Sequence, residues 1–364
     1  MKFSINQSEL QNALGTVLKG TSSKSTLPIL SGIYIETKED SLVFQATNLD
    51  LSIQYQAKAL IEEPGHTVVP GKLIFDIIKN MNDAAVHIST NDDNASIVCD
   101  SSSFIIRTLD PDDFPSFPKV EILQKISVPF ETFANMVKKV SRAASKDESK
   151  PALTGINVTL EDGTLSMVTT DSYRLALASA PVENDNAENF QAVISSVFMA
   201  DIVSLPKSEE NLTLALTENQ IVVTYQDTVF INRKIEGSFP AYKRIIPTGY
   251  VTRIAVSRQQ LIAAVRRASL LGSAGCSVKF EIDMPSKTLM LSSSQDSGSL
   301  KETLPFNGEG ENIEIGFNCA YVMDGLSSTD SDQVYLELTS STKAGVFKTT
   351  SESSFLYLVM PMRI

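Results

Sequence analysis

The chain has 364 residues but no tryptophan, only two histidines and only three cysteines. His66 lies in a turn-like stretch and His87 in an alternating one, so little is available for histidine-based nucleophilic catalysis. Cys99, Cys276 and Cys319 are widely spaced in apolar contexts, which indicates buried reduced thiols. The glycine patterns of nucleotide-binding loops are also missing. We therefore expect no enzyme activity, no cofactor and no metal site.

Long hydrophobic runs and an excess of positive charge are absent as well. No stretch approaches the roughly 18 apolar residues of a membrane helix, and the opening MKFSINQSEL lacks the apolar core of a secretory signal. We expect a cytoplasmic protein. The 31 basic and 43 acidic side chains give a net charge of −12. This balance argues against a protein that simply coats nucleic acid, and any DNA-binding hypothesis has to explain it.

What the chain does contain is a repeat of about 120 residues. Three stretches each combine an apolar strand with a small polar turn that contains an aspartate: LVFQATNLDLSI, LSMVTTDSYRLAL and LMLSSSQDSGSL. A second set aligns in the same way: FIIRTLDPDDFPSF, VFINRKIEGSFPAY and SFLYLVMPMRI. The apolar C-terminal stretch is therefore predicted to be the final strand of a third repeat. The predicted domains are residues 1–124, 125–247 and 248–364.

Each repeat also carries two helical patterns between alternating strand segments. Apolar side chains recur at helical spacing in SELQNALGTVLK, PGKLIFDIIKNM, PFETFANMVKKVSRAAS, SSVFMADIVSLP, SRQQLIAAVRRASLLG and NCAYVMDGLSS. Segments such as GIYIET and VFINRKI alternate as half-buried antiparallel strands do. The predicted fold class is α+β, with three repeated domains, antiparallel sheets on one side and paired helices on the other.

Basic side chains gather on the polar faces of several of these helices. They are Lys72 and Lys79 in the first repeat, Lys138, Lys139, Arg142 and Lys146 in the second, and Arg266 and Arg267 in the third. Ordinary solvated helix faces carry such residues too. Their recurrence in three repeats of an acidic chain favours a surface that faces DNA, although two of the six helices carry almost no basic residues.

Six stretches resemble the family of bacterial β sliding clamps, the processivity subunits of replicative DNA polymerases. They are TLPILSGIYIE, VVPGKLIFDIIK, DDFPSFP, TTDSYRLAL, FPAYKRIIP and VMPMRI, and the resemblance runs over the whole chain. It implies that two three-domain copies join head to tail into a closed ring, with helices lining a central hole and sheets outside. Twelve helices about 8–10 Å apart would line a circumference of about 100–120 Å, which admits a duplex. A ring that encloses DNA needs few phosphate contacts, so the acidic balance is no obstacle.

The resemblance implies three sets of site residues. Lys24, Lys72 and Lys150 align with DNA-contacting positions, and with the helix-face residues they complete a DNA-facing set of Lys24, Lys72, Lys79, Lys138, Lys139, Arg142, Lys146, Lys150, Arg266 and Arg267. Aromatic residues that the family can place next to this set are replaced here by Pro151 and Ala152. Ring closure would bring Leu270 and Leu271 of one copy against the region of Phe104 and Ile106 of the other.

The third set is a groove for peptides of the replicative polymerase, the clamp loader and other clamp-binding proteins. Its members are Leu153, Thr170, Ser172, Tyr173, Arg174, Leu175, Pro240, Arg244, Ile245, Leu358, Met360, Pro361, Met362, Arg363 and Ile364. Apolar walls would take aliphatic or aromatic anchors, while Arg174 and Arg244 would donate hydrogen bonds. Pro361 cannot donate to a strand ladder, so VMPMRI should lie at a sheet edge or leave the sheet. Tyr173 stands where relatives can have histidine.

Residue chemistry alone leaves other interpretations open. The C-terminal strand could simply fill a core, and so could Leu270 and Leu271. An enzyme is a second alternative, because Asp50, Asp171 and Asp296 recur, but they occur once per repeat and aspartate is ordinary at a turn. A monomeric protein-binding scaffold is the third.

Overall fold

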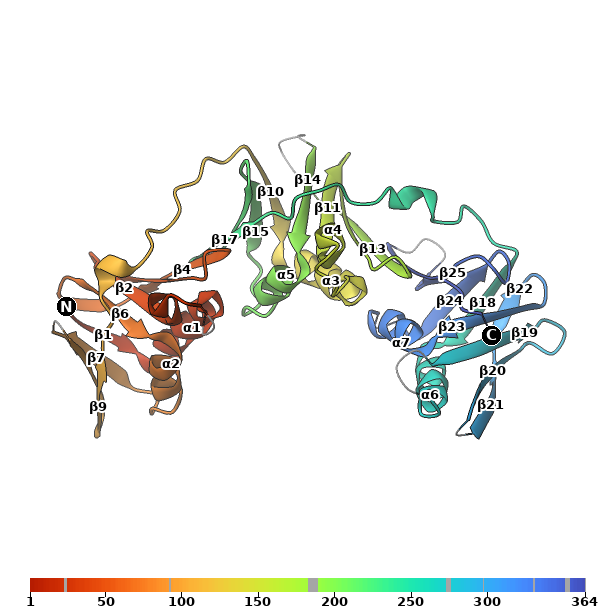
Figure 1. Ribbon diagram of the computed structural model, residues 1–364, viewed down its shortest axis with the longest axis horizontal. Helices are drawn as coiled ribbons and strands as arrows, with labels where there is room; N and C mark the ends of the chain where they lie inside the picture. The colour runs from red at the N-terminus through yellow and green to blue at the C-terminus, as the bar shows by residue number, and fades with distance from the viewer. Residues whose placement is uncertain are drawn as a thin grey trace. The chain divides into compact units, whose positions relative to one another are not determined.

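The structure is a computed structural model that describes residues 1–22, 25–91, 93–182, 189–272, 276–296, 298–329, 331–350 and 354–363 (Figure 1). It contains two compact units. The N-terminal unit consists of Met1–Phe130 and Ser204–Lys234, and the C-terminal unit of Glu131–Val203 and Ile235–Ile364. No helix of the described residues is long and apolar enough to cross a membrane. The limits of the three predicted domains stay a prediction.

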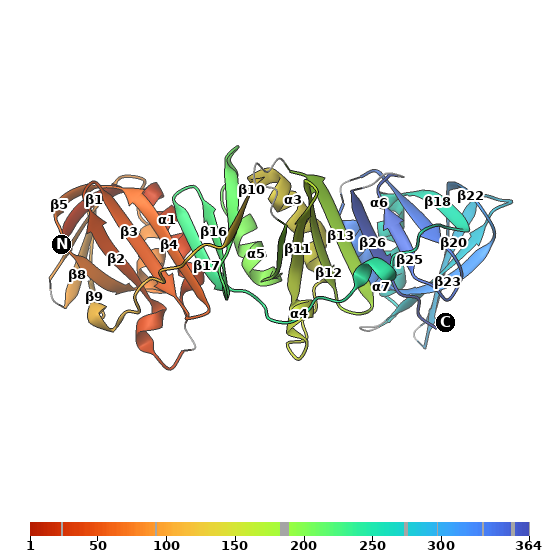
Figure 2. The same ribbon diagram turned by 90° about the horizontal axis from the view of Figure 1, so that it is seen from above.

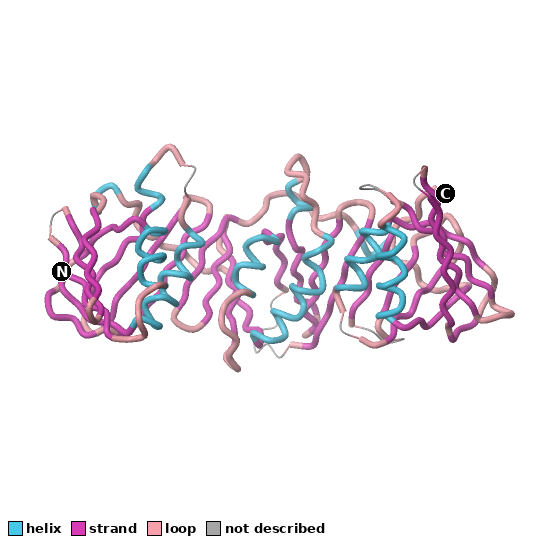
Figure 3. Tube along the Cα trace, turned by 90° about the horizontal axis from the view of Figure 1, so that it is seen from below, coloured by secondary structure: helices cyan, strands magenta, loops and turns pink. Residues whose placement is uncertain are grey.

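Two antiparallel sheets and two helices build the N-terminal unit. The larger sheet has the order β10 (Gln124–Pro129), β15 (Asn211–Leu216), β16 (Gln220–Tyr225), β17 (Thr228–Arg233), β4 (Leu51–Lys58), β3 (Ser41–Thr47), β2 (Gly32–Lys38), β6 (His66–Pro70). The smaller has the order β5 (Leu60–Glu63), β1 (Lys2–Asn6), β7 (Ala85–Thr90), β8 (Asn94–Cys99), β9 (Ser102–Arg107). The helices are α1 (Gln7–Val17) and α2 (Gly71–Lys79), which lie side by side (Figure 3).

The buried side chains explain how these two helices pack. Leu10, Leu14 and Val17 recur on one face of α1 and are fully buried, and Ile74 and Ile78 do the same on α2. At the start of α1 the side-chain Nε2 of Gln7 donates to the carbonyl oxygen of Ile78 at 2.6 Å, which fixes one helix to the end of the other. Both helices predicted in the first repeat are thus present and most of their apolar stripes are buried, while Leu18, Ile77 and Met81 remain half-buried.

The C-terminal unit is also built from a larger and a smaller antiparallel sheet, but it contains more helices. Its larger sheet has the order β14 (Phe190–Ser195), β11 (Gly155–Glu161), β12 (Thr164–Thr170), β13 (Arg174–Pro181), β26 (Phe355–Val359), β25 (Gly345–Lys348), β24 (Gln333–Leu338), β18 (Thr252–Ser257), β22 (Asn307–Glu309). The smaller has the order β21 (Gly298–Pro305), β20 (Thr288–Gln295), β19 (Ser277–Asp283), β23 (Ile313–Asn318). The helices are α3 (Phe130–Val140), whose first residue belongs to the N-terminal unit, α4 (Pro151–Thr154), α5 (Ser196–Val203), α6 (Arg258–Ser269) and α7 (Cys319–Ser327).

Two strand pairings join different sequence repeats into one sheet. In the N-terminal unit β4 of the first repeat pairs with β17 of the second, with Tyr55 opposite Thr228 (Figure 2). In the C-terminal unit β13 of the second repeat pairs with β26 of the third, with Arg174 opposite Val359. The predicted α+β class with repeated antiparallel sheets is confirmed, and the middle repeat shares its strands between two larger sheets.

Candidate functional site

The predicted groove residues that the structure describes all belong to the C-terminal unit. A cluster of buried apolar side chains lies at the junction of β13, β26 and β25, and we call it the groove floor: Val168, Leu175, Tyr242, Ala344, Val346 and Leu358. Leu177, Phe239, Ile246 and Leu356 pack against it while remaining partly exposed. Leu175 and Leu358 thus belong to the floor, where they support the surface and offer little of it to a ligand.

Around this floor the structure exposes large apolar side chains. They are Tyr173 in the turn between β12 and β13, Ile245 after the 3₁₀ turn Tyr242–Arg244, and Met360 and Met362 in the C-terminal tail. Exposed apolar side chains beside a buried floor are typical of surfaces that bind another molecule. Methionine suits such a surface because its flexible thioether can repack against different ligands.

The tail leaves the sheet where the proline predicts it. β26 ends at Val359, and the backbone then makes two hydrogen bonds outside the larger sheet. The Met360 N–H donates to the Tyr173 carbonyl at 2.8 Å, and the Met362 N–H donates to the Gly316 carbonyl at 2.8 Å. Pro361, between them, has no N–H to satisfy. The first bond holds Met360 beside Tyr173 and the second holds Met362 beside β23, while Ile364 lies outside the described residues.

A tight turn between β12 and β13 presents Tyr173. The Thr170 hydroxyl donates to the Arg174 carbonyl at 2.6 Å, and Asp171 Oδ1 accepts from the N–H groups of Tyr173 and Arg174 at 2.9 and 3.0 Å. Ser172 has a φ of +80°, a left-handed conformation that aspartate-anchored turns tolerate. Asp171 therefore has the structural role at a turn that its recurrence in the sequence indicated.

Arg174 differs from the prediction, because its side chain is only 10% exposed. Its Nε donates to Asp171 Oδ2 at 2.9 Å, and its Nη1 donates to Asp324 Oδ2 and, at 3.3 Å, to the Tyr357 hydroxyl. The guanidinium lies 4.5 Å from the ring centre of Tyr321. With Nε and Nη1 engaged inside the protein, Arg174 holds the turn in place, and its role as a donor to a ligand stays a prediction. Arg244, in contrast, is exposed.

These partners change the protonation equilibria around Arg174. Burial disfavours the charged guanidinium, but Tyr357, Asp324 and Asp171 more than offset that effect and the pKa of Arg174 is raised. Burial also raises the pKa of Tyr357. The arginine therefore stays charged and the tyrosine neutral over the physiological range.

Sequence reasoning missed two residues of α7 in this site. The Tyr321 ring stacks on that of Tyr173, with 6.4 Å between their centres, and the Asp324 carboxylate forms an ion pair with the Arg174 guanidinium. Residues three apart on a helix lie on one face, so this pair could have been found once α7 was predicted. The sequence alone could not show that this face of α7 packs against the turn that carries Tyr173 and Arg174.

The remaining groove residues vary in accessibility. Leu153 on α4 and Thr170 are buried, whereas Ser172, Pro240 and Arg363 are exposed and Pro361 is half-buried. The exposed residues are free to contact a ligand in the groove. Leu153 and Thr170 can act only as support.

The predicted DNA-facing residues are mostly exposed. Lys72 and Lys79 on α2 project from the N-terminal unit, while Lys138, Arg142, Lys146, Lys150 and Arg266 project from the C-terminal unit. Lys24 lies outside the described residues. Three members are less available, and one of them is Arg142, whose Nη1 lies 3.8 Å from Asp324 Oδ1. Lys139 is half-buried with its Nζ 6.0 Å from the ring centre of Phe355, and Arg267 makes a double hydrogen bond with Glu302.

Two sheets end in edge strands with exposed apolar side chains near them. β9 is an edge of its sheet in the N-terminal unit, and β21 is an edge in the C-terminal unit. On β9, Phe104 is exposed as predicted, but Ile106 is only 7% exposed and belongs to the core, whereas Ile105 is 73% exposed. The interface prediction therefore moves from Ile106 to Ile105. After α6, Leu270 is 79% exposed and Leu271 is half-buried.

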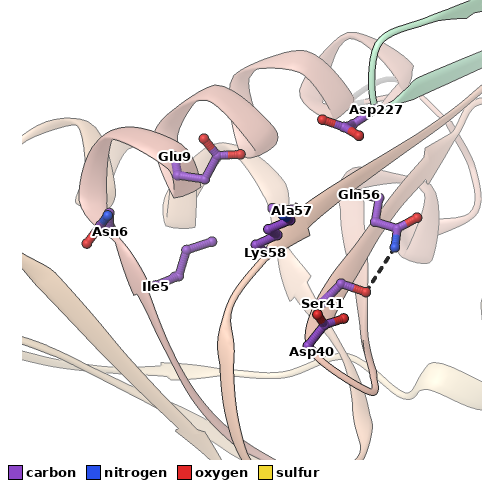
Figure 4. A pocket seen from close by; sticks show the side chains of 9 residues that line it. All are labelled: Ile5, Asn6, Glu9, Asp40, Ser41, Gln56, Ala57, Lys58 and Asp227. Carbon is purple, nitrogen blue, oxygen red and sulfur yellow. Dashed lines mark hydrogen bonds between the residues drawn. The ribbon is translucent and has the colours of Figure 1, made fainter.

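An acidic hollow of about 470 Å³ lies in the N-terminal unit (Figure 4). Glu9, Asp40 and Asp227 line it with a single cation, Lys58, and the Gln56 side chain donates to the Ser41 hydroxyl at 3.0 Å in its wall. Three carboxylates against one ammonium repel phosphate, so this hollow cannot be part of a DNA-binding surface. Among the described residues no group of three or more His, Cys, Asp or Glu side chains could hold a metal ion.

Comparison with known proteins gives matches along the whole chain. The N-terminal, central and C-terminal domain models of the DNA polymerase III beta subunit match residues 1–118, 127–241 and 243–363. A beta sliding clamp from Staphylococcus epidermidis is 31% identical over all of this chain and 99% of its own length, and one from Staphylococcus aureus is 30% identical with the same coverage. The crystal structure of a DNA polymerase sliding clamp from Bacillus subtilis matches with a TM-score of 0.94 and 28% identity, covering 100% of this chain and 99% of the other.

Proposed function

Because this chain belongs to the DNA polymerase III beta subunit family, the bacterial β sliding clamps, we propose that two copies join head to tail and enclose duplex DNA. Its function is that of a DNA sliding clamp, a non-catalytic factor that makes a polymerase processive. The closed ring of two copies is our proposal. We place the ring in the cytoplasm, with the bacterial DNA that it would surround.

The distribution of charge is the main observation that supports the proposal of a ring around DNA. Exposed lysines and arginines project from the helices α2, α3 and α6 and from the segments after α3, in a chain whose net charge is −12. A protein that gripped DNA from one side would need many phosphate contacts, each adding about 0.9 to the log–log salt slope. A ring holds DNA by topology, so a few contacts suffice and sliding stays easy.

The edge strands support closure of the ring. β9 with Phe104 and Ile105 lies in the N-terminal unit, and in the C-terminal unit Leu270 directly follows α6, the helix that contacts the edge strand β21. Exposed sheet edges with apolar side chains are unfavourable unless they are covered. Covering β9 of one copy with the β21 region of the other would satisfy both edges in a heterologous contact that closes after two subunits.

The groove in the C-terminal unit is proposed to bind peptides of the replicative polymerase, the clamp loader and other clamp-binding proteins. Its exposed apolar rim, with Tyr173, Ile245 and Met360, would take aliphatic and aromatic anchors over the buried floor. Affinity near the micromolar range, about −8 kcal/mol, would let partners exchange.

Retention on DNA of different topology tests enclosure directly. The protein is loaded by its clamp loader onto a nicked circular plasmid and, separately, onto the same plasmid after linearisation, and both are passed through a gel-filtration column. We expect the protein to remain on the circle and to slide off the linear form. Equal loss from both substrates would contradict enclosure, and equal retention would indicate ordinary binding.

A further inference from the structure

A cleft lies beside the groove, and most of the residues that line it belong to none of the predicted sites. We call it the linker cleft; it has a volume of about 650 Å³ and is formed by the chain from Arg244 to Val251 and by Thr339, Ser340, Lys343 and Ala344. The first segment connects the middle and last sequence repeats, and the second follows β24. A backbone hydrogen bond of 2.9 Å from the Val251 N–H to the Leu338 carbonyl holds the two walls together.

The linker cleft and the groove share a wall. Arg244 and Ile245 line the cleft and are also members of the predicted groove. Ala344 belongs to the groove floor, and Ile246 packs against that floor while also lining the cleft. A peptide anchored over the floor therefore has a continuous route into the cleft.

The charge in the linker cleft is the reverse of that of the whole chain. Arg244 and Lys343 line it and are exposed, and the described residues that line it include no carboxylate. The nearest carboxylates each have a partner. Glu309 lies at the edge of the cleft, where it accepts from the hydroxyl of the lining residue Tyr250 at 2.9 Å, and Glu337 pairs with Lys348 at 2.7 Å. The two lining cations therefore outnumber the one carboxylate at the edge. In a chain of net charge −12, the cleft therefore attracts an anionic ligand.

The walls also provide apolar and hydroxyl surface. Ile245, Tyr250 and Val251 are exposed, and Thr248 and Ser340 provide hydroxyl groups. A mixture of two cations, apolar patches and hydroxyls suits an extended acidic peptide better than a bare inorganic anion, which would use only the charges.

We propose that the linker cleft binds an acidic segment that flanks the apolar anchors of a partner peptide seated in the groove. This inference rests on the proposed peptide-binding function of the groove and adds a specificity element to it. The apolar anchors would provide most of the affinity. The acidic flank would discriminate between partners and make their binding dependent on ionic strength.

Peptides that differ only in the flank test the proposal. A fluorescein-labelled anchor peptide with one leucine and one phenylalanine is compared with versions carrying four glutamates, four serines or four lysines at either end. Anisotropy titrations use the full-length protein at 50 mM and 500 mM NaCl. We expect one acidic version to bind about fivefold more tightly than its serine counterpart at low salt, because two exposed ion pairs each contribute modestly. That gain should shrink at high salt.

Charge reversal in the cleft provides the matched variants. Lys343→Glu should abolish the gain from glutamates while leaving the anchor peptide's affinity unchanged. Lys207→Glu, which makes the same change at an exposed lysine of the N-terminal unit, should preserve the gain. Equal affinity of the glutamate and serine versions at both ends, or a gain that survives Lys343→Glu, would overturn the proposal and leave the groove intact.

Two further outcomes distinguish the remaining possibilities. If the anchor peptide itself does not bind, the groove proposal fails and this inference fails with it. If a single-stranded oligonucleotide of ten thymidines competes with the glutamate peptide and loses that ability in Lys343→Glu, the cleft is a nucleic-acid site and the acidic-peptide assignment is wrong.

Discussion

At the scale of single residues, Arg174 connects the groove turn to a helix. It is paired with Asp171 in the turn and Asp324 on α7, and it packs on Tyr321. Removing one partner of a buried ion pair costs about 3–5 kcal/mol, but Asp324 is one-third exposed, so solvent reduces the cost. We expect Arg174→Ala to lower the free energy of unfolding by about 2 kcal/mol in urea titrations.

Arg244→Ala is the matched control, because it removes the same side chain from an exposed position nearby. Its effect on unfolding should stay within about 0.5 kcal/mol. Arg174→Ala should also weaken peptide binding through the loss of a fixed Tyr173. A variant as stable as the wild-type protein would show that the ion pairs around Arg174 contribute nothing.

The thiol of Cys319 is expected to make the free energy of unfolding decrease at alkaline pH. Burial, helped by a hydrogen bond with Cys276, raises the pKa of the Cys319 thiol from 9.0 to about 12. The folded protein keeps a proton that the unfolded chain loses, so this contribution is complete below pH 9 and is lost as the pH rises toward 12. We expect it to have fallen by about 1 kcal/mol at pH 10.

Unfolding titrations at pH 8 and pH 10 can isolate this thiol. Wild-type protein should lose more stability over that interval than Cys319→Ala, by the amount attributed to Cys319. Tyr55 and Tyr357, whose pKa values burial also raises, titrate in both proteins and cancel in the comparison. Parallel losses in the two proteins would show that groups other than Cys319 cause the alkaline sensitivity.

At the scale of elements, the C-terminal stretch has two separate roles. β26 lies between β13 and β25, and its side chains Phe355, Leu358 and Val359 are buried. The following Met360–Arg363 leave the sheet and carry the exposed methionines. Deletion of Met360–Ile364 should therefore cost about 1–2 kcal/mol for two lost backbone hydrogen bonds and leave the fold intact. Peptide affinity should drop at least tenfold.

Circular dichroism and anisotropy together check this deletion. A longer deletion, from Phe355 onward, serves as the contrast, because it removes an interior strand and should unfold the C-terminal unit. A folded short-deletion protein that keeps its peptide affinity would place the peptide site elsewhere on the molecule.

Hydrophobic periodicity was enough to predict the helices, but it could not predict contacts between residues far apart in the sequence. The six predicted helices are present because each has a clear apolar stripe, whereas α4 has only four residues and is too short to show a period. The run FIIR on β9 is apolar on both faces, so alternation alone could not tell whether Ile105 or Ile106 is exposed. The engagement of Arg174 depended on Asp324, 150 residues away in the sequence.

At the scale of the whole molecule, closure of the ring is the property to test. Leu270→Glu and, separately, Ile105→Glu place a charge on side chains that are among the most exposed apolar ones described. Burying an unpaired carboxylate in an interface is strongly unfavourable. We expect each variant to sediment as a monomer at concentrations where the wild-type protein sediments as a dimer, and to be lost from nicked circular DNA.

Leu60→Glu is the control for these variants. Leu60 is exposed on β5, the opposite edge of the sheet that ends in β9, so it tests whether any charge on an exposed apolar edge disrupts association. It should leave the dimer unchanged. Dimers that persist in both Leu270→Glu and Ile105→Glu would contradict the proposed interface.

The strand pairings between repeats have a practical consequence for dissecting the protein. Because β4 pairs with β17 and β13 with β26, a fragment cut at a repeat boundary would expose an apolar strand edge that has lost its hydrogen-bonding partner. Such a fragment would tend to precipitate or to recruit foreign strands. A fragment that folds on its own would have to combine discontinuous stretches of the chain, as each compact unit does. The repeat seen in the sequence and the unit that folds cooperatively are therefore not the same segment of the chain.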